Sequence, residues 1–289
     1  MNLISIAKSI YCDPWLISPD MHKVLCDIVE AHIAGGEAEQ ARRALGEALV
    51  QSKAAITGKD EGKVEDKPVY QIMNGIAVIP LYGVIGKRVG MLEQSSGVTD
   101  VDVFSRAVMR ATNDPNVKRI MIDIDSPGGT VGGVQHAADV VRMAASQKKT
   151  MAYTGGTCAS AAYWIASGAD AIYCDATASV GSIGVYTMVL DTSRAYDNMG
   201  IKNQVFASGK FKAAGASGTS LSDEQKEQIQ KVVDDLASVF KADILRHNPA
   251  IAQETMQGQV FVGQSAKLAG LVDSICSFEK AMDDLLKWE

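Results

Sequence analysis

The stretch Thr154-Gly-Gly-Thr-Cys-Ala-Ser-Ala-Ala-Tyr-Trp-Ile-Ala166 joins an extended segment to a run of small, helix-forming residues, with Ser160 at the junction. A helix start leaves backbone N–H groups unpaired and carries a partial positive charge. A serine hydroxyl at such a junction lies among donors that can hold an oxyanion. A helix cap followed by a buried helix is the simpler interpretation of one serine after Gly-Gly. The rest of the chain must therefore decide between a cap and a nucleophile.

Extended and helical segments alternate around this stretch. Asn74-Gly75 separates two apolar runs and is a strong hairpin signal. Arg119–Asp125 is a predicted strand that ends at the glycine turn Ser126-Pro-Gly-Gly-Thr130, before a predicted helix over Val134–Ala145. The succession of strand, glycine turn and helix then repeats at Ser160, which is typical of a parallel sheet with crossover helices. We therefore expect the two glycine turns to lie side by side at one sheet edge.

The chain divides into three predicted parts. Residues 1–56 have apolar positions at helical spacing and predict an N-terminal helical segment. Residues 57–68 are charged and almost devoid of apolar residues, so they predict a linker. Residues 69–289 form the main domain, where the capping box Ser222-Asp-Glu-Gln225 opens a long helix. That helix has an apolar stripe that we expect to be buried: Ile229, Val232, Val233, Leu236, Phe240 and Ile244.

Composition excludes several function classes. The formal net charge of −6 argues against general binding to nucleic acid or anionic membranes. No apolar run approaches the roughly 18 residues that span a bilayer, and the N-terminus has no evident export signal, so we expect a cytoplasmic protein. Five scattered cysteines and four distant histidines give no metal-ligand spacing. We therefore expect neither a metal nor a cofactor.

A nucleophilic serine needs a base. Between His136 and His247 the chain has no histidine, so a lysine kept neutral by burial is the alternative. Lys212 is followed by small residues that would let it pack inside, and Lys210 would point the same way in an extended segment. The local pattern does not separate these two lysines. His136 as base and Cys158 as nucleophile are weaker alternatives.

Five motifs occur together in a fixed order: Asp125-Ser-Pro-Gly-Gly129, Ala159-Ser-Ala-Ala-Tyr163, Val180-Gly-Ser-Ile-Gly184, Ser208-Gly-Lys-Phe-Lys212 and Gly270-Leu-Val-Asp273. With these motifs, the chain resembles the signal peptide peptidase A family of serine–lysine proteases. It is most similar to the capsid-assembly, or head-maturation, proteases of tailed phages and prophages. The resemblance covers about residues 68–275. It implies an α/β fold of the Clp/crotonase type, a spiral of ββα units.

The resemblance also implies roles for individual residues. Ser160 matches the nucleophile, Lys212 the general base, and Ser182 the serine that orients the lysine. Gly129 and the backbone of Ala161 match the oxyanion donors. Ala213 stands where the family often has Asp or Ser after the lysine, which leaves open how that side of the lysine is satisfied.

The expected function is a serine endopeptidase that processes capsid, portal or scaffold proteins during phage head assembly, in the host cytoplasm and the assembling prohead. The expected partners are protein substrates and further copies of the chain, because the fold commonly assembles into rings. Three alternatives are a bacterial peptidase that degrades signal peptides, acyl-CoA chemistry on the same fold, and a non-proteolytic assembly or scaffold module. Residues 1–56 are expected either to dock onto an assembly partner or to cap the protease core.

Overall fold

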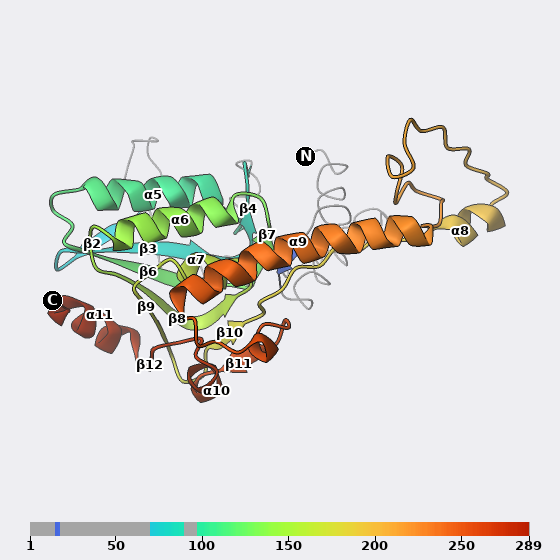
Figure 1. The fold of residues 1–289 in the computed structure, drawn as a ribbon. Helices are drawn as coiled ribbons and strands as arrows, with labels where there is room; N and C mark the ends of the chain where they lie inside the picture. Colours follow the sequence, from blue (N-terminus) through green and yellow to red (C-terminus); the bar gives the residue numbers. More distant parts are fainter. Residues whose placement is uncertain (1–14, 18–69, 90–96, 289) are drawn as a thin grey trace, which may run out of the picture.

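The computed structural model describes residues 15–17, 70–89 and 97–288 (Figure 1). The predicted linker and most of the predicted N-terminal helical segment lie outside these residues. Within that segment, Trp15–Ile17 forms a short strand, β1, which the helical pattern did not predict. The described part of residues 69–289 builds an α/β domain in which parallel strands alternate with helices.

The main sheet runs in the order β11-β10-β8-β6-β3-β2, with β9 beside β8 and β12 beside β9. The β3–β6, β6–β8, β8–β9 and β8–β10 pairs are parallel, as the crossover pattern predicts. Asn74 and Gly75 both have positive φ, and they close the predicted hairpin between β2 and β3. Its strands are β2 (Gln71–Met73), β3 (Ile76–Tyr82), β6 (Arg119–Ser126), β8 (Thr150–Ala159), β9 (Ala171–Cys174), β10 (Ser179–Gly181), β11 (Val260–Val262) and β12 (Ser274–Ile275).

A second, smaller sheet lies at the ends of these strands. It has the order β1-β7-β4-β5, where β4 is Ile85–Gly86, β5 is Thr99–Asp100 and β7 is Gly128–Thr130. Strand β7 is therefore paired on both edges, with β1 antiparallel on one side and β4 parallel on the other. The unit β6-β7-α6 confirms the predicted ββα arrangement, and the unit before it, β3-β4-β5-α5, has the same order with one further short strand.

Helices cover both faces of the main sheet. On one face α5 (Val101–Asn113), α6 (Val134–Ala145) and α7 (Ala161–Ala166) enclose the larger apolar core. Asp100 caps α5, where its carboxylate accepts from two backbone N–H groups of the first turn. On the other face α11 (Phe278–Lys287) covers a smaller core. Short segments complete the order: η1 (Gln253–Thr255) and α10 (Gln264–Leu268).

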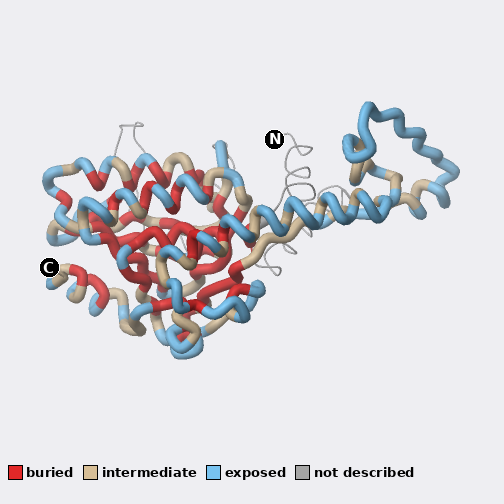
Figure 2. The backbone as a smooth tube through the Cα atoms, viewed as in Figure 1, coloured by how far each residue is buried: buried red, intermediate tan, exposed pale blue. Residues whose placement is uncertain are grey.

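The long helix α9 (Asp223–His247) begins at the predicted capping box and leads away from the domain (Figure 1). Its C-terminal end is buried against α7, whereas its N-terminal half is exposed (Figure 2). Residues 184–222, which we call the arm, run from the end of β10 along α9 to its outer end and contain α8 (Ser193–Asn198). The prediction that the apolar stripe of α9 is fully buried is therefore wrong, because the chain itself covers only part of the stripe. Phe240 and Ile244 are buried, but Val232 is exposed and Ile229, Val233 and Leu236 are only partly covered.

Candidate active site

Ser160 occupies the sharp turn between β8 and α7. Its backbone has φ 55° and ψ −115°, a conformation that residues with a side chain rarely adopt. A serine on a strained strand-to-helix turn presents its hydroxyl at the end of a sheet, and such strain concentrates at functional sites. The predicted position of Ser160 at a helix start is therefore confirmed. The predicted glycine turn at Gly155-Gly156 is wrong, because both glycines lie inside β8.

Gly155 and Gly156 instead mark where β8 changes neighbours. Residues before them pair with β9, and residues after them pair with β10. A side chain at Gly156 would lie 2.6 Å from the carboxylate of Asp125, which accepts from the N–H of Thr157 at 3.0 Å. The glycines thus let β8 run close to β6 on its way to Ser160.

Ser182 lies beside Ser160 because their strands are in register. Gly181 of β10 pairs with Ala159 of β8, so the two serines are the next residue on each strand. The N–H of Ser160 donates to the carbonyl of Gly181 at 2.8 Å. Ser182 also has positive φ, 52°, and both serines are buried. The structure therefore brings these two predicted site residues together.

Strand β7, which contains Gly128 and Gly129, reaches the same place directly after β6. Ser126 pairs with Cys158, and a Cβ at Gly128 would lie 3.0 Å from the carbonyl oxygen of Ala159. A Cβ at Gly129 would lie 1.8 Å from the carbonyl oxygen of Ile85, so only glycine fits. The predicted turn at Gly128-Gly129 is therefore wrong, because both glycines belong to strand β7, but the expected position of this segment beside the Ser160 turn is confirmed.

Ser160 Oγ is buried and has no hydrogen-bond partner among the described residues. Such an orphaned hydroxyl is rare in a folded protein and calls for an explanation, such as a partner that binds later. Cys158, the alternative nucleophile, lies fully buried between Ser126 and Val180. Burial raises the pKa of its thiol well above the ordinary range, which disfavours the reactive thiolate.

Neither predicted lysine lies at Ser160. Lys212 is exposed in the arm, contrary to the expectation that small neighbours would pack it inside. Lys210 forms an exposed ion pair with Glu224 at 3.0 Å, and its carbonyl accepts from Gln225. These contacts fix Lys210, two residues before Lys212, to the first turn of α9. The other end of α9 contacts α7. That end lies about 27 Å from the first turn along the helix, at 1.5 Å per residue. His136, the histidine alternative, is exposed on α6.

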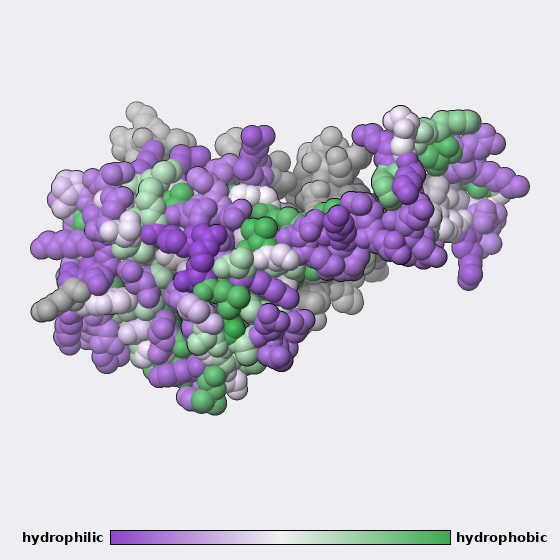
Figure 3. Space-filling view, viewed as in Figure 1, coloured by the Kyte–Doolittle hydropathy of each residue, from purple (hydrophilic) through white to green (hydrophobic). Residues whose placement is uncertain are grey.

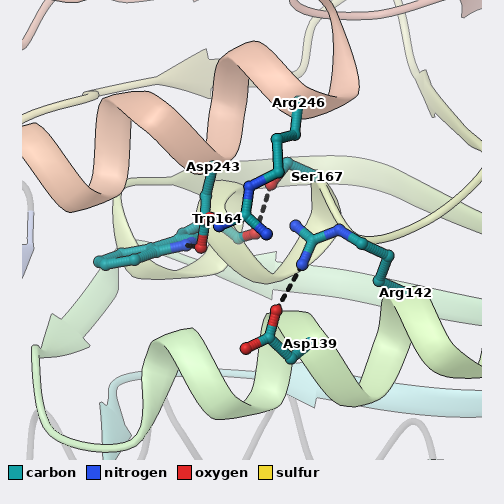
Figure 4. Close-up of polar contacts among 6 residues, drawn as sticks. All are labelled: Asp139, Arg142, Trp164, Ser167, Asp243 and Arg246. Atoms are coloured by element: carbon teal, nitrogen blue, oxygen red, sulfur yellow. Dashed lines mark hydrogen bonds and ion pairs between the residues drawn. The ribbon is translucent and has the colours of Figure 1, made fainter.

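Two residues at this site were missed from the sequence. Trp164 of α7 donates its indole N–H to Asp243 of α9 at 2.8 Å, and Asp243 also forms an ion pair with Arg246 (Figure 4). The Trp164 ring stacks on Phe240 with centroids 4.6 Å apart. The signal available was a single aspartate on the apolar stripe of α9, between Phe240 and Ile244.

A profile of peptidase family S49 matches residues 142–288, about half of the chain, including Ser160, Ser182 and Lys212. The chain belongs to peptidase family S49. This confirms the predicted family resemblance. Gly129 lies outside the matched range, so its role depends on the geometry of β7.

Individual relatives show which proteins the chain is similar to. Capsid assembly protease C of Escherichia phage lambda is 28% identical over 97% of this chain and 65% of that protein. The head-tail preconnector protein GP5 of Enterobacteria phage P21 is 28% identical over 97% of this chain and 56% of that protein. Protease 4 of Salmonella typhi is 28% identical over 66% of this chain and 31% of that protein. The S49 chain thus spans at most about two thirds of the length of these relatives.

Two further observations concern the described residues of the S49 chain. No helix among them is both long and apolar enough to cross a membrane. No cluster of three or more His, Cys, Asp or Glu side chains among them has a geometry suited to a metal ion.

Proposed function

We propose that this S49 chain is a serine endopeptidase that processes head proteins during phage assembly. Its nucleophile is Ser160, and its general base is Lys212 supplied by a second copy of the chain. The observation that carries the proposal is the buried hydroxyl of Ser160, which has no partner in the described part of the chain and lies on a strained turn beside Gly128-Gly129. The similarity to the lambda and P21 proteins supports head proteins as substrates.

The base has to come from another copy because Lys212 of the same chain is too far away. Lys210 is tied to Glu224 and Gln225, whereas α7 is tied to Asp243 near the other end of the same straight helix. The separation of about 27 Å along α9 exceeds what a lysine side chain spans. The exposed side chain of Lys212 is available to a neighbouring molecule.

The arm has the composition of an interface. Several of its apolar side chains are exposed and lie as green patches among hydrophilic ones at the outer end of the molecule (Figure 3), and Phe206 is 91% exposed. Exposed apolar patches rimmed by polar residues are a feature of contact sites between proteins. Docking of this arm over the Ser160 turn of a neighbour would remove Lys212 from water, and burial disfavours the charged ammonium. A closed ring of such contacts supplies one complete site per copy. The exposed apolar side chains of the arm are Met188, Leu190, Met199, Ile201, Val205, Phe206 and Phe211.

The mechanism follows from these positions. The neutral amine of Lys212 takes the proton of Ser160 Oγ while the oxygen attacks the peptide carbonyl. The N–H groups of Gly129 and Ala161 hold the oxyanion, and each such donor contributes roughly 3 kcal/mol. The ammonium then protonates the leaving amine, and an acyl-enzyme remains on Ser160. Water, deprotonated by the same lysine, releases the acyl group, while Ser182 orients the lysine.

A fluorophosphonate probe with mass mapping tests the nucleophile. We expect an adduct at Ser160 in the wild-type protein and none in Ser160→Ala. The matched control is Ser167→Ala, which changes a hydroxyl at the other end of α7. A wild-type protein that is unlabelled at every pH and binds acyl-CoA would establish the acyl-CoA alternative and remove the protease proposal.

Mixing variants tests the origin of the base. Ser160→Ala and Lys212→Ala are each expected to be inactive against peptide and head-protein substrates. After the two are mixed under conditions that exchange subunits, sites that combine an intact Ser160 with an intact Lys212 regain activity. If each variant is inactive and every mixture stays inactive despite subunit exchange, the shared site is wrong. If Lys212→Ala keeps full activity, the dyad itself is wrong.

A further inference from the structure

Helix α7 depends on its surroundings to hold Ser160 in place. It has only six residues, and a helix this short is not stable alone. The strained backbone of Ser160 persists only where neighbouring structure fixes it. The carbonyl of Ser160 accepts from the N–H of Trp164 at 2.9 Å, which closes the first turn of α7. Trp164 is therefore the residue through which the helix acts on the nucleophile.

Trp164 is in turn held by α9. Its indole N–H donates to one oxygen of Asp243 at 2.8 Å, and its ring lies on Phe240 at an interplanar angle of 12°. The other oxygen of Asp243 pairs with Arg246, whose side chain is 56% exposed while that of Asp243 is 0% exposed. Figure 4 shows Asp243 reaching from α9 to Trp164, with Arg246 extending from the same helix. The chain of contacts thus runs from Ser160 through Trp164 to Asp243.

An aspartate at this point is not explained by packing alone. It lies between the buried Phe240 and Ile244, where an apolar side chain would continue the stripe. A fully buried carboxylate is costly, and replacing a buried ion pair with apolar residues is often neutral or stabilising. The carboxylate provides a directional acceptor, which holds the indole in one orientation, whereas an apolar side chain would let it shift.

We propose that Asp243 is a positioning residue for Ser160. It holds Trp164, and through Trp164 the first turn of α7, so that the Ser160 hydroxyl and the Ala161 N–H keep the geometry that catalysis requires. The same contact joins α7 to the helix that carries the arm. This inference rests on the proposed function, because it assigns Asp243 a role in the reaction of Ser160.

The test compares two aspartate–arginine pairs with the same i,i+3 spacing. Asp243 pairs with Arg246 on α9 and faces α7, whereas Asp139 pairs with Arg142 on α6 and is 52% exposed. We expect Asp243→Ala to lower kcat and the rate of fluorophosphonate labelling about ten- to a hundredfold, with KM little changed, since small misplacements of reacting groups have effects of this size. Asp243→Asn keeps an acceptor and recovers part of the rate. Asp139→Ala stays near the wild-type rate.

Stability is separated from positioning by two more variants. Trp164→Phe removes the indole donor and keeps the stacked ring, so it should slow labelling without adding to Asp243→Ala in the double variant. Val108→Ala shortens a buried side chain of α5, away from α7. It should lower Tm without lowering kcat at temperatures where the protein is folded. If Val108→Ala lowers kcat as much as Asp243→Ala at equal loss of Tm, the positioning role is wrong.

Failure of this inference is distinguishable from failure of the proposed function. A wild-type protein without an adduct at Ser160 overturns the proposed function. A wild-type protein labelled at Ser160, with Asp243→Ala and Trp164→Phe labelled equally fast, overturns the role of Asp243 and leaves the proposed function in place.

Discussion

The region around Ser160 and the arm that carries Lys212 differ in almost every physical respect. Ser160, Ser182 and the Gly128-Gly129 segment are buried and held by parallel strands in register, whereas Lys212 lies on an exposed segment at the outer end of α9 (Figure 2). One region is set by the folding of a single chain, and the other has an exposed apolar surface that a single chain leaves uncovered. The difference teaches that the serine side of this candidate site is formed within one chain, whereas the lysine side is exposed on the surface.

The largest expected effect on activity comes from substitution of the lysines of the arm, and it tests whether the arm contributes to the site at Ser160. Lys212→Ala should lower kcat by about six orders of magnitude, since removal of the general base from a nucleophile–base unit has effects of this size. Lys210→Ala is the matched control, because Lys210 makes a surface ion pair with Glu224, and such pairs contribute little. Steady-state cleavage of a peptide substrate measures both. If Lys210→Ala is the more damaging change, the assignment of the base is reversed.

The two ends of α9 should differ in stability. Phe240→Ala removes a buried ring stacked on Trp164 and should lower the free energy of unfolding by about 3 to 5 kcal/mol. Val232→Ala, on the half-exposed outer part, should lower it by less than about 1 kcal/mol. Denaturant unfolding of dilute protein measures both changes. Equal losses would show that the outer part of α9 is covered in solution even when the protein is dilute.

The arm should affect assembly more than folding. Phe206→Asp places a charge on a side chain that is 91% exposed, so Tm of the single chain should change little. Activity at low protein concentration should fall roughly tenfold or more if burial of that ring between copies contributes a few kcal/mol. Raising the protein concentration should restore part of the lost activity. Gln204→Ser, also exposed in the arm, is the control, and sedimentation with parallel activity assays is the measurement.

The smallest expected effect is a pH dependence at the inner end of α9. Burial lowers the pKa of the His247 imidazole from its ordinary value of 6.5, with Asp273 opposing that shift. The unfolded chain therefore binds this proton more readily, and stability contributed at neutral pH is lost as pH falls through about 6.5. In His247→Gln the fall in unfolding free energy between about pH 7.5 and about pH 5.5 should be smaller. An unchanged slope would exclude His247 as the source.

The sequence predicted the region around Ser160 better than it predicted the arm, for physical reasons. Strand and helix periodicity and the Asn74-Gly75 hairpin are local signals, and they predict the parallel strands whose carboxyl ends bring Ser160 and Ser182 together. The burial of Lys212 was wrongly predicted because small neighbours permit packing without requiring it. The α9 stripe was wrongly predicted to be fully buried because periodicity indicates an apolar face, not whether the same chain covers it.

Longer-range features could not be read from local patterns. The pair between Trp164 and Asp243 joins residues 79 positions apart, and one aspartate on an apolar stripe does not say which residue it meets. Strand β1 has only three residues and lies within a segment dominated by helical spacing. Its partner, Gly128–Thr130, is more than a hundred positions away.

Strand β1 also changes how the neighbourhood of Ser160 is approached from outside. It contributes two buried residues, Leu16 and Ile17, and it completes the edge of β7. With β4 on the other side, β7 has no unpaired edge, so no incoming peptide can join it as an added strand while β1 is in place. Any shortened version of the protein that starts after residue 17 would expose that edge. In such a version a peptide could reach the neighbourhood of Ser160 along the open edge of β7. Its cleavage pattern should therefore not be taken as that of the protein with β1.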